Sequence, residues 1–411
     1  MLDFIKDKKS CTGCNACVNI CPVNCISMVQ DEEGFSYPHA NEECIDCKKC
    51  EKICPIKSNQ TQIQPTIKQY SVAALTKDFN TWKRSTSGGA FTEICNSFGD
   101  DNTIVFGAKF AQFKVIHTYV IGVKNIEAFR KSKYVQSDIN YSFKKAKYFL
   151  DNGKKVIFSG TPCQIAGLRS FLHKEYENLL CLDLICHGVG SPKVFREFIK
   201  YVNQKYHSVI STYNFREKKI KFGNFKLHTS RYIFINKSEK YIEKDEYNIL
   251  FLNQLCTRES CGTNCQFRTS NRLGDLTIGD FKNLKEVFPK IKDYKNYSTI
   301  IFNSRKGYSL LQKIESGMKI IPCDIKSIKE YNPLFYKSTI DNPLRYNFFN
   351  DFINEMPFSK LIEKYSPQSN AISLLASIKD FVPYCLKREL STIIIRIKKA
   401  EHSIILFNDK K

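Results

Sequence analysis

The stretches CTGCNACVNICP (residues 11–22) and CIDCKKCEKICP (residues 44–55) decide the fold of the N-terminal part of the chain. Each is a C-x2-C-x2-C-x3-C-P run, which suits a pair of 4Fe-4S clusters because the fourth cysteine of each run crosses to the other cluster. Paired C-x2-C units also suit tetrahedral zinc, but two complete copies that end in Cys-Pro favour iron and sulphur. The runs therefore predict an α+β, ferredoxin-like dicluster module over residues 1–60. The predicted ligands are Cys11, Cys14, Cys17 and Cys54 for one cluster, and Cys44, Cys47, Cys50 and Cys21 for the other.

Composition limits what the rest of the chain can be. A chain of 411 residues suits two or three domains, and its 42% hydrophobic content is enough for a globular core. No run of about 18 apolar residues is present, so no transmembrane segment is expected. The N-terminus lacks the apolar stretch of an export signal, and the 18 cysteines are therefore predicted to be ligands or core residues rather than disulfides. We expect a cytoplasmic protein.

The net charge of +22 is unevenly distributed. Residues 1–60 carry −2, from seven basic and nine acidic side chains, and the remainder carries +24, from 56 basic and 32 acidic side chains. A basic body could hold the module against itself, or attract an acidic partner, nucleic acid or an anionic membrane surface. It could also be a lysine-rich, solvated surface. No nucleic-acid motif accompanies the charge, so nucleic acid is not a predicted partner.

The polar segment SNQTQIQPTIK is predicted to link the module to an α/β body with a partly parallel sheet. Residues 154–186 predict a βαβ unit: the strand KKVIFSG, a helix from TPCQ with Thr161 as N-cap, and the strand LLCLDLIC. Parallel strands end at one edge of the sheet, so Cys163 and Cys186 should lie together where ligands of open α/β sheets bind. Cys163 also falls in the first turn of a helix, which favours the thiolate.

Residues 256–268, CTRESCGTNCQFR, predict a cysteine-rich loop. Cys261 and Cys265 could join Cys163 and Cys186 as ligands of a third cluster, with Cys256 as a spare. Alternatively, Cys163 is a nucleophile or redox thiol, or several of these cysteines belong to the core. A strand follows between residues 275 and 280, and Asp280 either faces the site or lies in a turn.

The segment RSTSGGAFTEI predicts a helix start that suits an anionic ligand. Ser87 is predicted to cap the helix, while Gly88 and Gly89 let a phosphate approach free N–H groups beside Arg84. An ordinary capped helix is the alternative. Two strands, IVFGAKF and FKVIHTYVIG, should follow, and then a loop, FRKSKYVQSD, that could contact a ribose, a phosphate or a flavin ring. The remaining cysteines and the histidines near these segments are predicted to be structural: Cys25, Cys95, Cys181, Cys323, Cys385, His117 and His187.

The body is divided here into residues 70–150 and 151–335, followed by a helical, basic tail over residues 336–411. The tail mixes apolar and basic residues, as in STIIIRIKK. It could lie on a membrane surface as a peripheral contact, although packing on its own domain or on a partner is favoured.

Six motifs in order, RSTSGGAFTEI, FRKSKYVQSD, FSGTPCQIAGLR, DLICHGVGSPKVF, SCGTNCQF and GDLTIGDF, resemble the coenzyme F-420 hydrogenase/dehydrogenase beta-subunit family. The resemblance covers roughly residues 70–285. It implies an FAD- and 4Fe-4S-dependent oxidoreductase that moves electrons between a one-electron chain and a two-electron organic substrate. It also implies a redox partner protein, either a ferredoxin or a partner subunit, and for bacterial members with a fused ferredoxin, a place in polysaccharide biosynthesis.

By motif match, the residues expected at the FAD are Arg84, Ser87, Gly88, Gly89, Ser132, Lys133, Tyr134, Gln136 and Thr161. The match also implies that Cys163, Cys186, Cys261 and Cys265 are ligands of a cluster near the flavin. Three rival functions stay open: a non-catalytic electron carrier for a partner enzyme, a deazaflavin (coenzyme F-420) oxidoreductase subunit, and a basic nucleic-acid- or membrane-binding redox protein. A radical-type cluster enzyme ranks last, because its C-x3-C-x2-C signature is missing.

Overall fold

The computed structural model describes residues 2–57, 67–221, 224–263, 265–291 and 295–366. The chain divides into two compact units, Met1–Glu355 and Met356–Lys411. In the described part of the second unit, α14 spans Phe358–Tyr365. Most of the predicted linker and most of the predicted helical tail lie outside the described residues. Among the helices that are described, none is long and apolar enough to cross a membrane.

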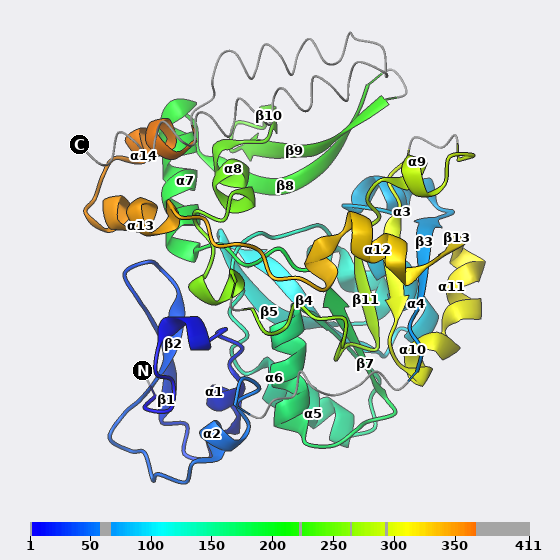
Figure 1. Cartoon of the computed structure of the whole chain (residues 1–411), viewed down its shortest axis with the longest axis horizontal. Coiled ribbons are helices and arrows are strands. Elements are labelled where there is room, and N and C mark those ends of the chain that lie inside the picture. Colours follow the sequence, from blue (N-terminus) through cyan, green and yellow to red (C-terminus); the bar gives the residue numbers. More distant parts are fainter. Residues whose placement is uncertain (1, 58–66, 222–223, 264, 292–294, 367–411) are drawn as a thin grey trace. The chain divides into compact units, whose positions relative to one another are not determined.

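The N-terminal module has the predicted ferredoxin-like character (Figure 1). Its two strands pair antiparallel, with Ile26 opposite Ala40. Each cysteine run turns into a short helix after a residue in the left-handed conformation, Asn15 (φ 62°) for the first and Lys48 (φ 55°) for the second. The elements are η1 (Lys8–Ser10), α1 (Ala16–Ile20), β1 (Ile26–Gln30), β2 (Ser36–Ala40) and α2 (Lys49–Lys52).

The body is built on an eight-stranded sheet in the order β13-β3-β12-β11-β7-β6-β4-β5. Strands β4, β6, β7 and β11 run parallel to their neighbours in this group, and the outer pairings are antiparallel. The predicted partly parallel sheet and the βαβ unit of β6, α6 and β7 are therefore confirmed. The strands are β3 (Tyr70–Thr76), β4 (Ile104–Ala111), β5 (Lys114–Ile121), β6 (Val156–Gly160), β7 (Leu179–Leu184), β11 (Leu276–Asp280), β12 (Ser298–Phe302) and β13 (Met318–Cys323).

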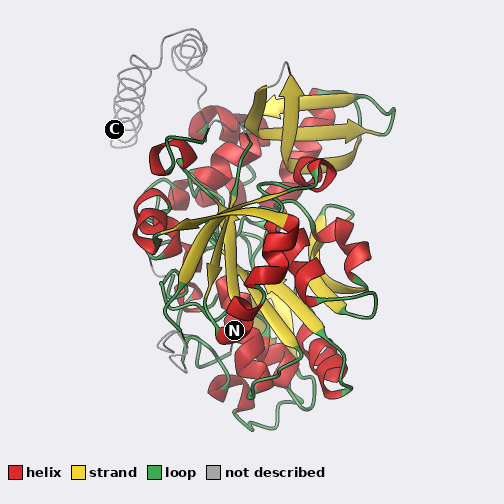
Figure 2. Cartoon of the chain, turned by 90° about the vertical axis from the view of Figure 1, so that its right-hand side faces the viewer, coloured by secondary structure: helices red, strands yellow, loops and turns green. Residues whose placement is uncertain are grey.

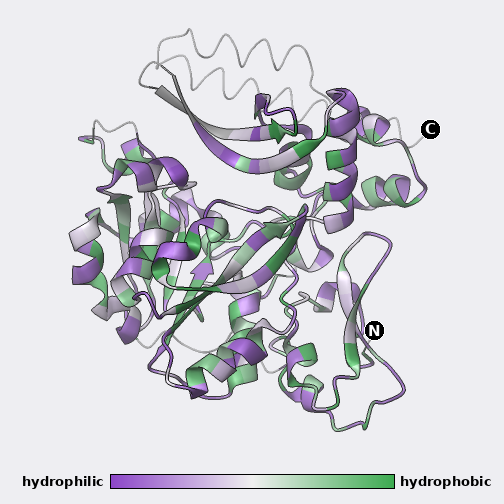
Figure 3. Cartoon of the chain, turned by 180° about the vertical axis from the view of Figure 1, so that it is seen from behind, coloured by the Kyte–Doolittle hydropathy of each residue, from purple (hydrophilic) through white to green (hydrophobic). Residues whose placement is uncertain are grey.

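Both faces of this sheet are covered, as the alternation of its side chains requires. Phe158 of β6 and Cys181 of β7 belong to the core beneath α5 and α6, whereas Ile157 and Leu180 belong to the core beneath α4 and α11. Helices lie on either side of the strands in Figure 2, and they mix hydrophobic and hydrophilic residues in Figure 3. The helices of this body include α3 (Phe79–Arg84), α4 (Ala90–Phe98), α5 (Ser142–Asp151), α6 (Pro162–Leu172), α10 (Arg305–Ser309), α11 (Leu311–Gly317) and α12 (Ile325–Tyr331).

A second, three-stranded antiparallel sheet follows β7 and was not predicted. Its buried aromatic side chains surround Asp245, which accepts hydrogen bonds from the hydroxyls of Tyr213 (2.6 Å) and Tyr232 (2.9 Å) and caps the next helix. The strands of this sheet are β8 (Ile210–Lys221), β9 (Asn224–Phe234) and β10 (Glu239–Glu243), and the helices α7 (Pro192–Lys205) and α8 (Glu246–Leu252) precede and follow them in the chain. The other helices of the described first unit are η3 (Val123–Phe129), η4 (Glu259–Cys261), α9 (Leu284–Val287), η5 (Pro333–Phe335) and α13 (Arg345–Ile353).

The module docks on the body through a buried arginine. Arg258 is 1% exposed, its Nε donates to the Cys11 carbonyl at 2.9 Å, and its Nη1 donates to the Ser36 carbonyl at 3.1 Å. Its guanidinium also lies over the Tyr37 ring, 4.1 Å from the centroid. An ion pair between Arg345 and Glu33 (2.5 Å) adds a second attachment. Two arginines of the body, Arg258 and Arg345, therefore hold the module in place.

Arg258→Met is expected to lower the free energy of unfolding by roughly 3 kcal/mol, because two buried carbonyls would lose a charged donor. Urea unfolding of the cluster-loaded chain measures this change. Lys9→Gln is the control, since Lys9 and Glu259 form an exposed pair at 3.6 Å, and its effect should stay within about 0.5 kcal/mol. Equal effects of the two substitutions would contradict the role assigned to Arg258.

Candidate functional site

The first cysteine group of the module lines one small cavity. Cys11, Cys14, Cys17 and Cys54 all line it, together with apolar side chains such as Ile5 and Ile56. Burial, reinforced by the neighbouring thiols, raises the pKa of Cys14 to about 12. Cluster ligands are thiolates, so protons must leave as a cluster is bound. The four cysteines predicted to bind the first cluster therefore line one apolar hollow, and Cys54 reaches it from the second run.

The second cysteine group lies nearer the solvent. Cys44 and Cys47 are exposed, and Cys50 is half-buried. Burial raises the pKa of Cys50, and the thiols of Cys47 and Cys44 raise it further. Cys21 Sγ lies 3.4 Å from the sulphur of Cys25, which in turn interacts with Cys44. Cys21 is thus brought toward the second run, and Cys25, predicted to be structural, is a fifth thiol beside this group.

A third group forms in the body from residues far apart in the sequence. Burial raises the pKa of Cys163 to about 12, and the thiols of Cys186 and Cys265 add to the effect. Cys261 interacts with all three of these thiols. Cys256, the predicted spare, is buried elsewhere and interacts with Tyr247 instead. The structure therefore brings together the four body cysteines that the motifs singled out.

Local contacts explain why these loops meet. Arg268 donates from Nε to the Cys186 carbonyl at 3.1 Å and from Nη2 to the His187 carbonyl. Gly188 has φ +135°, and a Cβ there would lie 3.2 Å from Cys261 Cβ, so glycine permits the approach of the two loops. The Thr161 hydroxyl lies 3.1 Å from Cys163 Sγ and can donate to its thiolate.

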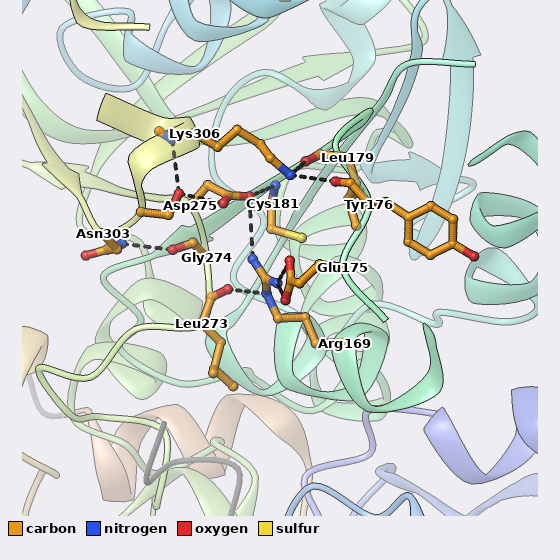
Figure 4. A network of polar contacts seen from close by, with 12 residues as sticks. Arg169, Glu175, Tyr176, Leu179, Cys181, Leu273, Gly274, Asp275, Asn303 and Lys306 are labelled. Carbon is orange, nitrogen blue, oxygen red and sulfur yellow. Dashed lines mark hydrogen bonds and ion pairs between the residues drawn. The ribbon is translucent and has the colours of Figure 1, made fainter. Parts of the chain in front are cut away.

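A polar network fixes α6, the helix that begins beside Cys163, to the segment that follows the cysteine-rich loop (Figure 4). Arg169 Nε donates to the Leu273 carbonyl at 2.5 Å, and its Nη2 lies 3.5 Å from Asp275. Asp275 in turn accepts from the Cys181 N–H of β7 at 2.8 Å. Because one carboxylate is tied to both the helix and the strand, Cys163 keeps its position relative to the loop that carries Cys265.

A cavity of about 380 Å³ opens at the carboxyl ends of the parallel strands, within the range of small-molecule sites. Thr161 follows β6, Cys186 follows β7 and Asp280 ends β11, and all three line it. Asp280 therefore faces the site rather than an isolated turn, and it accepts from Arg216 of β8 at 2.6 Å. The basic side chains of the lining are Arg130, Lys131, Lys133, Arg216 and Lys282.

The residues expected at the FAD separate into two sets. Ser87, Gly89, Ser132, Lys133, Tyr134 and Thr161 line the cavity. Arg84, Gly88 and Gln136 lie outside the lining. Arg84 is exposed and pairs with Glu127 at 3.4 Å. The side chain of Gln136 accepts from Arg258 at 3.0 Å, so it serves the docking of the module.

The prediction that Ser87 caps α4 is wrong. The N-cap is Gly89, with φ 93°, a conformation that favours glycine. Ser87 Oγ instead donates to the Tyr297 carbonyl at 2.6 Å. Gly88 is required for close packing, since a Cβ there would lie 2.2 Å from the Ala74 carbonyl oxygen. Its N–H donates to Ser298 Oγ at 2.8 Å, so this amide is not free for an anion.

Arg130 is the main lining residue that the motifs did not single out. Its side chain is 10% exposed, and its Nη1 lies 3.3 Å from Glu127. Within the described residues, neither its Nε nor its Nη1 makes a hydrogen bond. A partly buried guanidinium whose Nε has no hydrogen-bond partner among the described residues favours an anion in this cavity. Arg130 is the second residue of the FRKSKY segment, so its place beside Ser132 and Lys133 could have indicated its role from the sequence.

Two matches to protein families bear on this arrangement. Residues 10–58 match the 4Fe-4S dicluster domain. Residues 153–326 match the family described as the C terminus of the beta subunit of coenzyme F420 hydrogenase/dehydrogenase. A search of curated proteins finds no match. One solved structure, "Xenon derivatization of the F420-reducing [NiFe] hydrogenase complex from Methanosarcina barkeri", is 16% identical, with a TM-score of 0.42 over 74% of this chain and 93% of that chain.

The site and the two family matches define an iron–sulphur protein. The chain carries a 4Fe-4S dicluster domain at its N-terminus, followed by the C-terminal domain of the coenzyme F420 hydrogenase/dehydrogenase beta-subunit family. This confirms the resemblance that the six motifs indicated.

His117 ties the floor of the cavity to the start of α6. Its Nε2 lies 2.9 Å from the Ser159 carbonyl, which can only accept, so Nε2 carries the proton and Nδ1 accepts from the Ser137 hydroxyl at 2.8 Å. Gln164 donates to the same hydroxyl at 2.9 Å. Burial lowers the pKa of His117 to about 4, with the charge of Lys133 a smaller cause in the same direction. The imidazole is therefore neutral in the folded protein at pH 7.

His117→Gln is expected to make the stability less sensitive to acid. Between pH 6.5 and 4 the unfolded chain binds a proton at His117 that the folded chain does not, so wild-type stability falls as the pH falls. From pH 7.5 to pH 5 this histidine accounts for about 2 kcal/mol, which the variant should not lose. Urea midpoints of both proteins at the two pH values measure the difference. Identical losses in the two proteins would show that His117 is not the titrating group.

Proposed function

We propose that the chain is an FAD- and 4Fe-4S-dependent oxidoreductase that passes electrons between the clusters of the module and a two-electron organic substrate. The observation that carries the proposal is the position of the body cysteines. Cys163 interacts with Cys14 of the module, and Cys186 of the same group lines the large cavity. A third cluster on these cysteines would stand between the dicluster module and the cavity.

The cavity suits a flavin on chemical grounds. It combines small and hydroxyl-bearing residues at Ser87, Gly89 and Ser132 with basic side chains, among which Arg130 has an Nε without a hydrogen-bond partner in the described residues. A dinucleotide carries a diphosphate that can satisfy such a guanidinium. Bound FAD would supply the exchange between single electrons and a hydride equivalent. We place the diphosphate at Arg130 and assign Lys133 to holding the loop, since its Nζ donates to the carbonyls of Ala128 (2.9 Å) and Arg130 (2.7 Å).

The substrate belongs to the same proposal. It is a small organic molecule reduced or oxidised by two electrons in the cavity, and the resemblance associates it with polysaccharide biosynthesis. A deazaflavin is the competing substrate. The description of the matching family as a beta subunit also favours an alternative, in which the chain carries electrons for a separate catalytic subunit.

Anaerobic purification with iron, sulphide and flavin quantified together tests the proposal. We expect about twelve irons per chain, four for each of three clusters, and one FAD. A count of about eight irons per chain would show that the third cluster is absent. A chain that binds no flavin after reconstitution would overturn the flavoprotein assignment. An enzyme should reoxidise its reduced flavin with an organic substrate alone. If turnover requires a partner subunit, the carrier alternative replaces the proposal.

Arg130→Gln is expected to weaken FAD binding by about 10- to 100-fold, because a buried, charge-assisted contact to the diphosphate is lost. Fluorescence titration of the flavin-free chain measures the affinity. Arg84→Gln is the matched control, because Arg84 approaches the same Glu127 but lies outside the cavity, and its affinity should match the wild type. A larger effect at Arg84 than at Arg130 would favour the motif-based assignment over the placement of the diphosphate.

A further inference from the structure

A buried glycine in the middle of α6 has no explanation in the helix itself. Gly167 is the sixth residue of the eleven-residue helix Pro162–Leu172. Glycine inside a helix is about 1 kcal/mol less favourable than alanine, so a buried example usually marks a close approach. Gly167 follows Cys163 by four residues and thus lies one turn further along the same face of the helix.

The close approach is made by the module. A Cβ at Gly167 would lie 3.1 Å from both the Cβ and the Sγ of Cys14, and 3.3 Å from Phe143 of α5. Cys14 is one of the four sulphurs of the first cavity, and it interacts electrostatically with Cys163. Gly167 therefore lies against Cys14, on the helix that also carries Cys163.

Packing around this point allows little adjustment. Ala16 of α1 is 1% exposed and lies in the same core as Ala146 of α5 and Ala166 of α6. Gly13 of the module is equally confined, because a Cβ there would lie 2.4 Å from the side chain of Gln136. Residues without bulky side chains thus let the backbone of the first cysteine run lie close against the body on either side of Cys14. Figure 1 shows α1 beside α6.

We infer that Gly167 is a positioning residue that sets the distance between the module and the cysteine group of the body. This rests on the proposed function for its redox consequence. If Cys14 and Cys163 each held a cluster, a single electron could pass from the reduced cluster of the module to the oxidised cluster of the body, with no bond formed or broken. A side chain at position 167 would press on Cys14, separate the two groups and slow that transfer, while removing none of the cysteines.

The test uses the full chain, purified anaerobically with its clusters and reduced by dithionite. Gly167→Ala and Gly167→Leu are compared with Ala146→Val, which adds bulk to the same core from α5. In the glycine variants we expect an altered EPR signal and reduction potential of the module cluster that binds Cys14. We also expect the magnetic interaction between this cluster and the body cluster to weaken, with a larger loss in Gly167→Leu than in Gly167→Ala. Ala146→Val should retain both properties.

The outcomes separate this inference from the proposed function. If the wild-type chain binds only about eight irons, the third cluster is absent, yet the signal of the module cluster still reports whether position 167 presses on Cys14. If both glycine variants keep the wild-type signal, potential and magnetic interaction, the inference is overturned even in a protein with three clusters and flavin. If Ala146→Val changes them equally, general overpacking explains the result and Gly167 has no special role.

Discussion

The parallel pairing of β6, β7 and β11 is the constraint on which the rest of this structure depends. Phe158 pairs with Cys181 and Leu182 pairs with Leu276, so the three strands end at the same edge of the sheet. Four residues of the two sites lie at these ends: Thr161 and Cys163 after β6, Cys186 after β7, and Asp280 as the last residue of β11. If β7 ran antiparallel to β6, Cys163 and Cys186 would lie at opposite edges, and neither a four-cysteine group nor a cavity lined from all three strands could form.

The parts of the fold that could be predicted are those with dense local signals. Thr161 and Pro162 mark the start of α6, and the strands on either side are short and apolar, so the βαβ unit follows from about thirty residues. The cysteine spacing likewise specifies the module and its crossed ligand pattern. The grouping of the four body cysteines was predicted from two sources, the common edge at which parallel strands end and the resemblance to the beta-subunit family. Because parallel strands end at the same edge of a sheet, the sequence alone predicts that Cys163 and Cys186 lie together. Cys261 and Cys265 lie in a loop whose sequence has no apolar periodicity, so their positions could not be predicted in this way.

What escaped prediction depends on contacts between distant residues. Arg258 contacts the module at Cys11, which lies 247 residues earlier in the sequence. No local pattern indicates that an arginine in a cysteine-rich loop is buried at an interface. Gln136 belongs to a motif expected at the flavin, yet its neighbours in space are Gly13 and Arg258. Ser87 looked like an N-cap because serine commonly is one, but the left-handed conformation at Gly89 moves the helix start two residues onward. In each case tertiary packing overrides a local preference.

The second cysteine group of the module is more exposed than the other two groups, and this has consequences for how iron is bound. Cys44 and Cys47 are exposed, whereas burial raises the pKa of both Cys14 and Cys163 to about 12. A buried thiol stays protonated until a metal replaces its proton, so the thiols of Cys14 and Cys163 are neutral in the metal-free chain and become thiolates only as iron binds. Binding at these groups is therefore linked to the packing of α1 against α6, because the same contact that buries Cys14 brings it to Cys163. Iron binding at Cys44 and Cys47 is not linked to this packing, because both cysteines are exposed.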